Sequence, residues 1–196
     1  MIPFVGFPKI ARYSRDCVIT EKIDGTNAQV WIPTDEERAA MPEKWRVLPF
    51  IVGSRTRWLY PPGDNHGFSA WAYANQSCLL ELGPGHHFGE WWGQGIQRKY
   101  GLTEKRFSLF NVSRWTAERP ACCGVVPLLW EGEFGTACPG ETINDVLDVL
   151  RSLGSLAAPG FMFPEGIVIY HIASGVSFKK TLEHDEKPKG ITHDPI

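Results

Sequence analysis

Lys22 lies in the segment EKIDGTN (residues 21–27), between a β-favouring run and a glycine turn. A lysine amine is a nucleophile when it is uncharged, and burial or nearby positive charge favours the uncharged form. The neighbouring carboxylates of Glu21 and Asp24 oppose this effect. A metal ion would resolve the conflict, because a bound cation is often the largest local charge in a site. Lys22 could therefore serve as a nucleophile if a divalent cation offsets the charge of its acidic neighbours.

Three segments in the middle of the chain carry residue types that suit a nucleotide. Arg55 and Arg57 alternate at the end of a predicted strand, so both guanidinium groups face one side and could hold a phosphate or a ribose edge. Glu90 stands beside two tryptophans and between glycines that let a ligand approach the backbone closely. Phe110 lies in an apolar run and could stack on a purine.

Two segments near the C-terminus complete the set. Glu165 stands at the start of a β-branched run, where a carboxylate can hold a divalent cation through oxygen or water ligands. Lys179 and Lys180 end the next run and could neutralise phosphate charge near Lys22. Taken singly, each segment also fits an ordinary structural role, such as an exposed arginine pair, a core phenylalanine or a solvated lysine pair. Their occurrence together along one chain favours the functional interpretation.

The ordered set resembles the motifs of the covalent nucleotidyltransferases, the superfamily of ATP-dependent ligases and mRNA capping enzymes. The glutamate before Lys22 and the asparagine five residues after it are most similar to the RNA ligase family that includes the second RNA ligase of phage T4 and the trypanosome editing ligases. The resemblance covers roughly residues 9–190. It implies an α+β nucleotidyltransferase fold (ATP-grasp-like, as in ligase adenylation domains) of antiparallel sheets flanked by a few helices.

The resemblance also implies an ATP-dependent reaction. Lys22 would attack the α-phosphate of ATP, release pyrophosphate and carry AMP as a lysyl-phosphoramidate; AMP would then pass to a 5′-phosphate of RNA and be displaced by a 3′-hydroxyl. Asp24 and Glu165 would hold Mg²⁺ or Mn²⁺. The implied nucleotide-binding residues are Glu21 at the adenine edge, Phe110 stacked on the adenine, Glu90 at the ribose, Arg55 near the ribose and the incoming strand, Asn27 with a larger role toward the strand, and Lys179 and Lys180 at the α-phosphate. One or both of these lysines would also be catalytic, by stabilising charge in the transition state.

Two features depart from that family pattern. Asn111 follows the stacking phenylalanine where relatives often have aspartate. About sixteen residues follow Lys180, too few for an oligonucleotide-binding or helical C-terminal domain, so we expect one adenylyltransferase domain over residues 1–196. Such a core should adenylylate itself, and a protein partner could be needed for strand joining. The alternatives are a DNA ligase acting on DNA, a capping-type enzyme using GTP, and a non-catalytic nucleic-acid-binding relative.

The composition of the 196 residues, 43% hydrophobic and 21% charged, is that of a soluble globular chain. A net charge of -2 excludes the generally basic surface of a protein that coats nucleic acid. Any contact with nucleic acid must therefore be made by a local basic groove. The five cysteines form no C-x-x-C pair, so we expect reduced, mostly buried thiols. No run reaches the ~20 apolar residues of a membrane span, and no secretory signal opens the chain. We therefore expect a cytoplasmic protein without membrane contact.

The elements that must position these residues are mostly strands. Alternating and β-branched runs predict strands at residues 18–20, 28–32, 50–53, 107–112, 125–130, 166–170 and 176–180. Helical patterns predict helices at residues 34–45, 67–75 and 143–153, the last with a Thr142/Asp145 capping box and a stop at Gly154. Residues 61–65 and 139–140 are expected to be surface loops, residues 187–190 to open a polar tail, and His86 and His87 to lie exposed on a glycine-rich turn.

Overall fold

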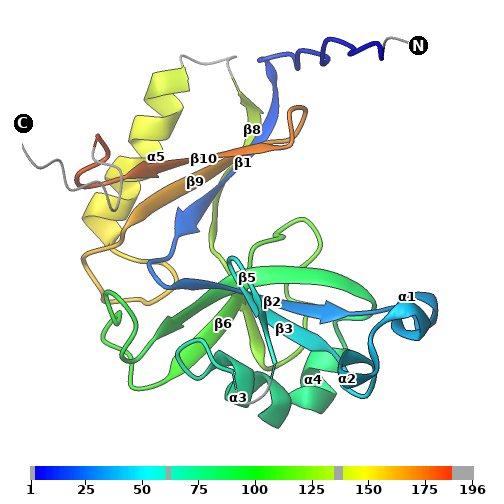
Figure 1. Ribbon diagram of the computed structural model, residues 1–196. Coiled ribbons are helices and arrows are strands. Elements are labelled where there is room, and N and C mark those ends of the chain that lie inside the picture. The colour runs from blue at the N-terminus through cyan, green and yellow to red at the C-terminus, as the bar shows by residue number, and fades with distance from the viewer. Residues whose placement is uncertain (1–2, 61–62, 135–138, 187–196) are drawn as a thin grey trace, which may run out of the picture. The chain divides into compact units, whose positions relative to one another are not determined.

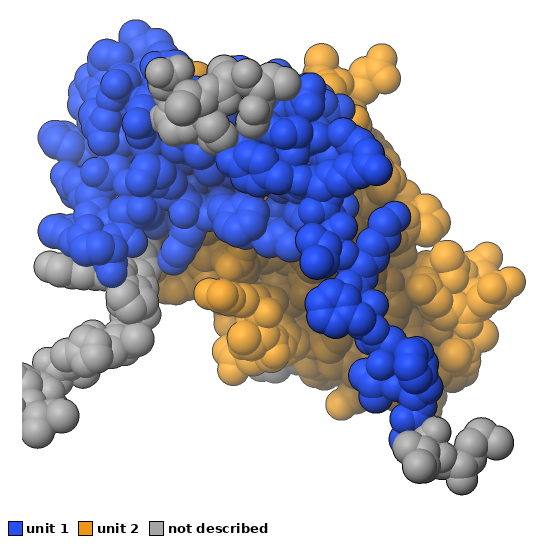
Figure 2. Space-filling model, turned by 90° about the horizontal axis from the view of Figure 1, so that it is seen from above, with its two compact units in different colours: residues 1–22, 128–154, 162–196 blue, residues 23–127, 155–161 orange. Residues whose placement is uncertain are grey.

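The computed structural model describes residues 3–60, 63–134 and 139–186. They form two compact units, each built around its own sheet (Figure 1). Unit 1 comprises residues 1–22, 128–154 and 162–196, and unit 2 comprises residues 23–127 and 155–161 (Figure 2). Sheets dominate both units and helices are few, which confirms the predicted α+β class.

Unit 1 is a four-stranded antiparallel sheet with one long helix on a face (Figure 1). The strand order is β10-β9-β1-β8. The elements are β1 (Arg15–Lys22), β8 (Leu128–Phe134), α5 (Pro139–Leu153), β9 (Gly166–His171) and β10 (Val176–Thr181). Apolar residues at helical spacing on α5 pack against alternate residues of β1 and β9, as an amphipathic helix on a sheet requires. The core they form consists of Cys17, Ile19, Val146, Leu147, Leu150, Ile167 and Ile169.

Unit 2 is a six-stranded sheet in the order β4-β3-β2-β5-β6-β7. Its strands are β2 (Thr26–Ile32), β3 (Ile51–Ser54), β4 (Trp58–Leu59), β5 (Gly85–Gly93), β6 (Lys105–Leu109) and β7 (Cys123–Val125), and its helices are α1 (Asp35–Ala40), α2 (Glu43–Arg46), α3 (Phe68–Ala74) and α4 (Gln76–Leu80). Neighbouring strands are antiparallel except β6 and β7, which are parallel, so the sheet is mixed rather than purely antiparallel. Residues of α3 and α4, including Phe68 and Leu79, bury one face of this sheet against Val30 and Trp91.

Proline explains three differences from the predicted elements. The helix expected at 34–45 is two short helices, α1 and α2, because the chain is extended at Met41 and Pro42. The strand expected at 125–130 is divided between β7 and β8 by Pro127, which has no N–H to donate to a ladder. The helix expected at 143–153 begins at Pro139, so Thr142 lies within it and Pro139 and Gly140 are helical rather than a loop. A proline is well suited to the first helical turn.

The nine-residue strand β5 was absent from the predicted strands, and it is central to unit 2. It pairs with β2 on one side and β6 on the other. His86 and His87 therefore lie in a strand and not on a turn, and they point to opposite faces: His86 is exposed, but His87 is buried. Burial lowers the pKa of His87, whose Nε2 is hydrogen-bonded to the Gly83 carbonyl at 2.8 Å. His87 is thus a neutral core residue.

The cysteines of the described part of the chain are all unpaired thiols, as expected from their spacing. Cys17 and Cys123 are buried, whereas Cys78 and Cys122 are half-buried. Burial raises the pKa of Cys123 to about 12, which keeps this thiol protonated at neutral pH. Cys138 and the predicted polar tail at 187–190 lie outside the described residues. Among the described helices, none has the length and apolar character needed to cross a membrane.

Gly166 at the start of β9 is constrained by both conformation and space. Its φ is 153°, and a Cβ added there would lie 2.2 Å from the Lys180 carbonyl oxygen. We expect Gly166→Ala to lower the free energy of unfolding by about 3 kcal/mol or more, because β10 would have to move. Gly175→Ala is the matched control: its φ is 66° but nothing lies within 4 Å of the added Cβ, so only a conformational cost of about 1–2 kcal/mol applies. Urea unfolding followed by circular dichroism measures both values, and equal losses would contradict the steric explanation.

Candidate active site

Lys22 and Glu165, 143 residues apart in sequence, form an ion pair in unit 1. Lys22 ends β1 and is paired in register with Gly166 of β9, which places the preceding Glu165 beside it. The Lys22 Nζ donates to Glu165 Oε2 at 2.8 Å. Glu165 is 2% exposed, and its carbonyl accepts from the Leu182 N–H just after β10. The carboxylate is therefore held in place and orients the lysine amine.

The register of the sheet separates the two C-terminal lysines. Lys179 lies in the row of Val168 and Thr20, which is the Lys22 face of the sheet, because alternate residues of a strand share a face. Lys180 lies in the row of Ile167 and Glu21, on the opposite face, which packs against α5. Lys180 is also within 3.4 Å of the Asp185 carboxylate.

This arrangement predicts unequal effects of the two lysine substitutions. We expect Lys179→Ala to slow transfer of AMP to the protein by roughly 100-fold or more, the typical effect of removing a group that stabilises developing charge. Lys180→Ala should slow it by less than about tenfold, because its side chain is on the face away from Lys22. Single-turnover labelling with ATP measures both rates. A larger effect of Lys180→Ala would contradict the assignment drawn from the strand register.

Glu21 lies on the opposite face of β1 from Lys22. It is 1% exposed and shares the face of Ile19 and Cys17, which form the core under α5. Lys22, the next residue, faces the other side of the strand. A role for Glu21 at the adenine edge therefore stays a prediction.

In unit 2 the predicted nucleoside-binding residues share one face of the sheet. Asn27 of β2 is directly opposite Glu90 of β5. Glu90 is 8% exposed, and its Oε1 accepts from the Gly25 N–H at 3.0 Å, which fixes the glycine turn after Lys22. Phe110, just beyond β6, donates its N–H to the Phe88 carbonyl and is 39% exposed, so its ring is accessible for stacking. This face thus combines a carboxylate, an amide and an accessible aromatic ring.

Arg55 and Asn111 lie at the margins of this face. Arg55 follows β3 in the exposed turn toward β4. It is two residues after Gly53, which is paired with Gln29, so it continues the face of the sheet that carries Gln29 and Asn27. The Asn111 Oδ1 accepts from the Ser113 hydroxyl and the Arg114 N–H and so stabilises a turn. The amide thus has a structural role at this position.

Asp24 is held by two residues that the sequence had not singled out. Arg98 Nε lies 3.2 Å from Asp24 Oδ2, and the Asp24 N–H donates to the Tyr100 hydroxyl at 2.7 Å. Both partners come from the loop after β5, in which Lys99 and Tyr100 adopt positive φ angles of 60° and 52°. Such conformations are costly for residues other than glycine and tend to occur at functional sites. The glycine-rich sequence around this loop, GQGIQRKYG, was the available signal.

The two predicted metal ligands belong to different units, Asp24 to unit 2 and Glu165 to unit 1. In the described residues each carboxylate has a cationic partner, Arg98 and Lys22 respectively. That part of the chain contains no group of three or more side chains of the types His, Cys, Asp and Glu that could enclose a metal. Mg²⁺ is commonly bound by one or two carboxylates together with water and substrate phosphates, so each of these carboxylates is of a type that could serve as a ligand.

Comparisons with known proteins agree with this reading of the residues. The sequence matches the RNA ligase family over residues 15–181. Similar solved structures include mutants of Naegleria gruberi RNA ligase: one with ATP and Mn (19% identity, TM-score 0.56, covering 85% of this chain and 48% of that chain), and one with AMP and Mn (19% identity, TM-score 0.55, covering 85% and 49%). A comparison with curated proteins gave no match.

The chain spans about half the length of these solved structures, and at this identity the likeness shows a shared fold. The family match is the stronger finding, because it extends from the first residue of β1 to the last residue of β10 and includes the segments that carry Lys22, Glu90 and Glu165. On this match the chain belongs to the RNA ligase family.

Proposed function

We propose that this protein is an ATP-dependent RNA ligase, or the adenylylating core of one, and that Lys22 is its nucleophile. The observation that carries the proposal is the Lys22 Nζ held 2.8 Å from the buried Glu165 carboxylate, within a match to the RNA ligase family. The buried carboxylate fixes the position of the lysine amine, which must lose its proton before it can attack phosphorus. We further propose the nucleotidyltransferase fold of ligase adenylation domains, since the sheets, helices and solved RNA ligase structures are all compatible with it.

The reaction would proceed in three steps. The Lys22 Nζ forms a bond to the α-phosphorus of ATP, the bond from that phosphorus to the pyrophosphate oxygen breaks, and the amine loses a proton. The AMP then passes from Lys22 to the terminal 5′-phosphate of an RNA strand, which regenerates the lysine amine. The 3′-hydroxyl of a second end attacks that phosphate, a phosphodiester bond forms and AMP leaves. Lys179, on the Lys22 face of its sheet, would stabilise charge on the α-phosphate in the first step.

The face of the unit 2 sheet that carries Glu90 and Phe110 would bind the nucleoside. Phe110 offers a ring for the adenine, and Glu90 offers carboxylate oxygens to the ribose hydroxyls. Glu90 also holds the Gly25 N–H, so substitution of Glu90 would disturb both the ribose contact and the turn after Lys22. Asn27, opposite Glu90, and Arg55 would contact the ribose and the incoming strand.

Asp24 and Glu165 would hold Mg²⁺ or Mn²⁺ together with water and nucleotide phosphates. The metal would supply positive charge to the phosphates and the leaving pyrophosphate. Its charge would also offset the negative charge of the carboxylates next to Lys22. The ligands in the Naegleria structures, ATP or AMP with Mn, support a nucleotide and a divalent metal as the cofactors.

Labelling of the protein by nucleotide tests the proposal. The purified chain is incubated with ATP or GTP labelled at the α-phosphate, with and without Mg²⁺ or Mn²⁺, then denatured and examined for bound label. The proposal predicts label from ATP that requires the metal. Label from GTP alone would identify a capping-type enzyme, and label from neither nucleotide would contradict an enzymatic role.

Nicked duplexes then separate the remaining alternatives. Matched nicks with ribose or deoxyribose on the 3′-hydroxyl side distinguish an RNA ligase from a DNA ligase, because only the 2′-hydroxyl differs. We expect joining at the ribose nick. A protein that labels itself but joins neither nick would be an adenylylating core that needs a partner for strand binding.

A further inference from the structure

An aromatic strip crosses the unit 2 sheet on the same face as Glu90 and Asn27. The strip consists of Trp31 on β2, Trp58 on β4, and His86 and Phe88 on β5. The rings of Trp31 and His86 stack at 5.1 Å with planes 2° apart, Trp58 stacks on Trp31 at 5.6 Å, and His86 on Phe88 at 5.9 Å. His86 is exposed, and Trp58 and Phe88 are 39% and 53% exposed, so the rings of the strip are accessible to solvent. The proposed chemistry of AMP transfer does not use these rings.

The strip continues from the proposed nucleoside-binding face. Glu90, Phe88 and His86 are alternate residues of β5 and therefore point to one side of the sheet. The Phe88 carbonyl accepts a hydrogen bond from the N–H of Phe110, the residue proposed to stack on the adenine. At about 3.3 Å per residue, His86 lies about 13 Å along β5 from Glu90. The strip thus extends away from the nucleoside-binding residues and ends at a pocket.

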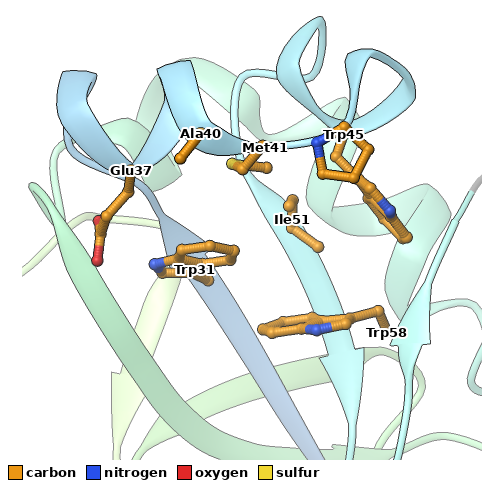
Figure 3. Close-up of a pocket in the computed structure, with 8 residues that line it drawn as sticks. Trp31, Glu37, Ala40, Met41, Trp45, Ile51 and Trp58 are labelled. Carbon is orange, nitrogen blue, oxygen red and sulfur yellow. The ribbon is translucent and has the colours of Figure 1, made fainter.

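That pocket lies where α1 and α2 cover the end of the strip (Figure 3). Its volume of about 520 Å³ is within the range of roughly 300–1,000 Å³ that is typical of ligand sites. It is lined by Trp31, Glu37, Ala40, Met41, Pro42, Trp45, Ile51 and Trp58. The Nε1–H of Trp31 is buried and has no hydrogen-bond partner within the described residues.

Unpaired positive charge near the strip lies beside Trp58, whereas α1 and α2, which line the pocket, also carry the exposed acidic residues Asp35, Glu36 and Glu43. Arg55 and Arg57 are exposed in the turn before Trp58, and no described carboxylate forms an ion pair with either. Lys44 lies over the Trp45 ring at 5.5 Å. The carboxylate in the pocket, that of Glu37, already accepts from the Thr34 N–H at 2.8 Å and could accept a further N–H from a base edge. Arg55, Arg57 and Lys44 could thus contact phosphates, while the neighbouring aromatic rings could stack on bases.

We propose that the aromatic strip and its pocket bind unpaired bases of the RNA strand that the enzyme joins. Base–aromatic stacking tolerates any sequence because every base has a π-face, and a nearby positively charged groove that follows the backbone is the usual companion of such rings. The identity of the strand as RNA rests on the proposed function. The site is tested by binding of RNA in the absence of ATP. A result that contradicts the site therefore differs from a result that contradicts the ligase assignment, which is tested by labelling with ATP.

The experiment compares variants from two sides of the pocket, Trp58→Ala and Trp45→Ala, with Tyr170→Ala as a matched control. Tyr170 is an aromatic residue of unit 1 that is 42% exposed, similar to Trp58. Fluorescence anisotropy with a labelled single-stranded oligoribonucleotide, at one fixed salt concentration, gives the affinities. We expect Trp58→Ala to weaken binding roughly 5- to 100-fold, the range for loss of one stacked base, and Trp45→Ala to weaken it in the same direction. Trp58→Phe should restore most of the affinity.

Self-adenylylation and oligomeric state are measured on the same variants. Unchanged labelling by ATP with weakened RNA binding supports the proposal, because the fold and the nucleotide chemistry are then intact. Wild-type RNA affinity in both tryptophan variants would overturn it. A change in oligomeric state by light scattering without a change in RNA affinity would also overturn it, in favour of an interface between copies of the chain. An equal loss in Tyr170→Ala would show that the effect is not specific to the strip.

Discussion

Lys22→Ala is expected to reduce covalent labelling by ATP below detection. The bond to AMP needs an amine at this position, and alanine supplies no nucleophile. Lys22→Arg should be equally inactive although it keeps the positive charge, because a guanidinium is not deprotonated in proteins. Loss of label in both variants would therefore separate nucleophilic attack from simple charge neutralisation. The measurement is gel detection of label after denaturation, with circular dichroism to show that the variants fold.

Lys9→Ala is the control for this prediction, because Lys9 is an exposed lysine of the same unit. It should label as the wild type does. Retained label in Lys22→Ala would contradict the assignment of the nucleophile and move it to another residue.

Glu165→Gln should have the second largest effect, a fall in the labelling rate of about 100-fold or more. The substitution keeps the shape of the side chain and an oxygen that can accept from Lys22, but it removes the negative charge. The Nζ now held at 2.8 Å would be less firmly oriented, and misplacement of a reacting group by about 1 Å can cost about 100-fold in rate. The proposed metal would also lose a carboxylate ligand. Single-turnover labelling over a range of Mg²⁺ or Mn²⁺ concentrations measures both effects.

Glu165→Asp is the companion variant, since it keeps the charge and shortens the reach. We expect partial activity that rises with metal concentration, whereas Glu165→Gln should stay low at every concentration. Wild-type rates in Glu165→Gln would show that the ion pair with Lys22 serves stability alone.

Two residues of the candidate site that residue types and their order singled out are in contact in the structure. The segment around Lys22 and the carboxylate at 165 were both singled out, and the structure joins them in one ion pair. Their contact could not be deduced from sequence, because it depends on the register between β1 and β9 over 143 residues. The same register distinguishes Lys179 from Lys180, which are adjacent in sequence but lie on opposite faces of the sheet.

The missed features have physical explanations. β5 contains glycines at 85, 89 and 93, which lower its strand propensity and break the alternation of polar and apolar residues. Gly89 is nevertheless required, because a Cβ there would lie 2.5 Å from the Ser108 carbonyl oxygen of the neighbouring strand. Arg98 was missed because its partner, Asp24, is 74 residues away and only the folded loop brings them together. The need for Gly89 and the role of Arg98 both depend on contacts between residues that are far apart in the sequence.

The aromatic strip shows the same dependence on tertiary structure. Trp31, Trp58 and His86 are spread over three strands, and none of the three resembles a motif in its own segment. The sheet places them in contact, and the break of the predicted helix at Met41 and Pro42 lets α1 and α2 form the pocket. A predicted continuous helix gave no reason to expect a pocket at this place.

The most direct test of the central claim is to locate AMP on the protein. The wild-type chain is incubated with ATP and Mg²⁺ or Mn²⁺, digested, and its peptides are analysed by mass spectrometry under conditions that preserve a phosphoramidate. The account predicts AMP on the peptide that contains Lys22, with fragment ions that place it on this residue. AMP on any other residue, or no adenylylated peptide under conditions in which ATP is bound, would contradict it.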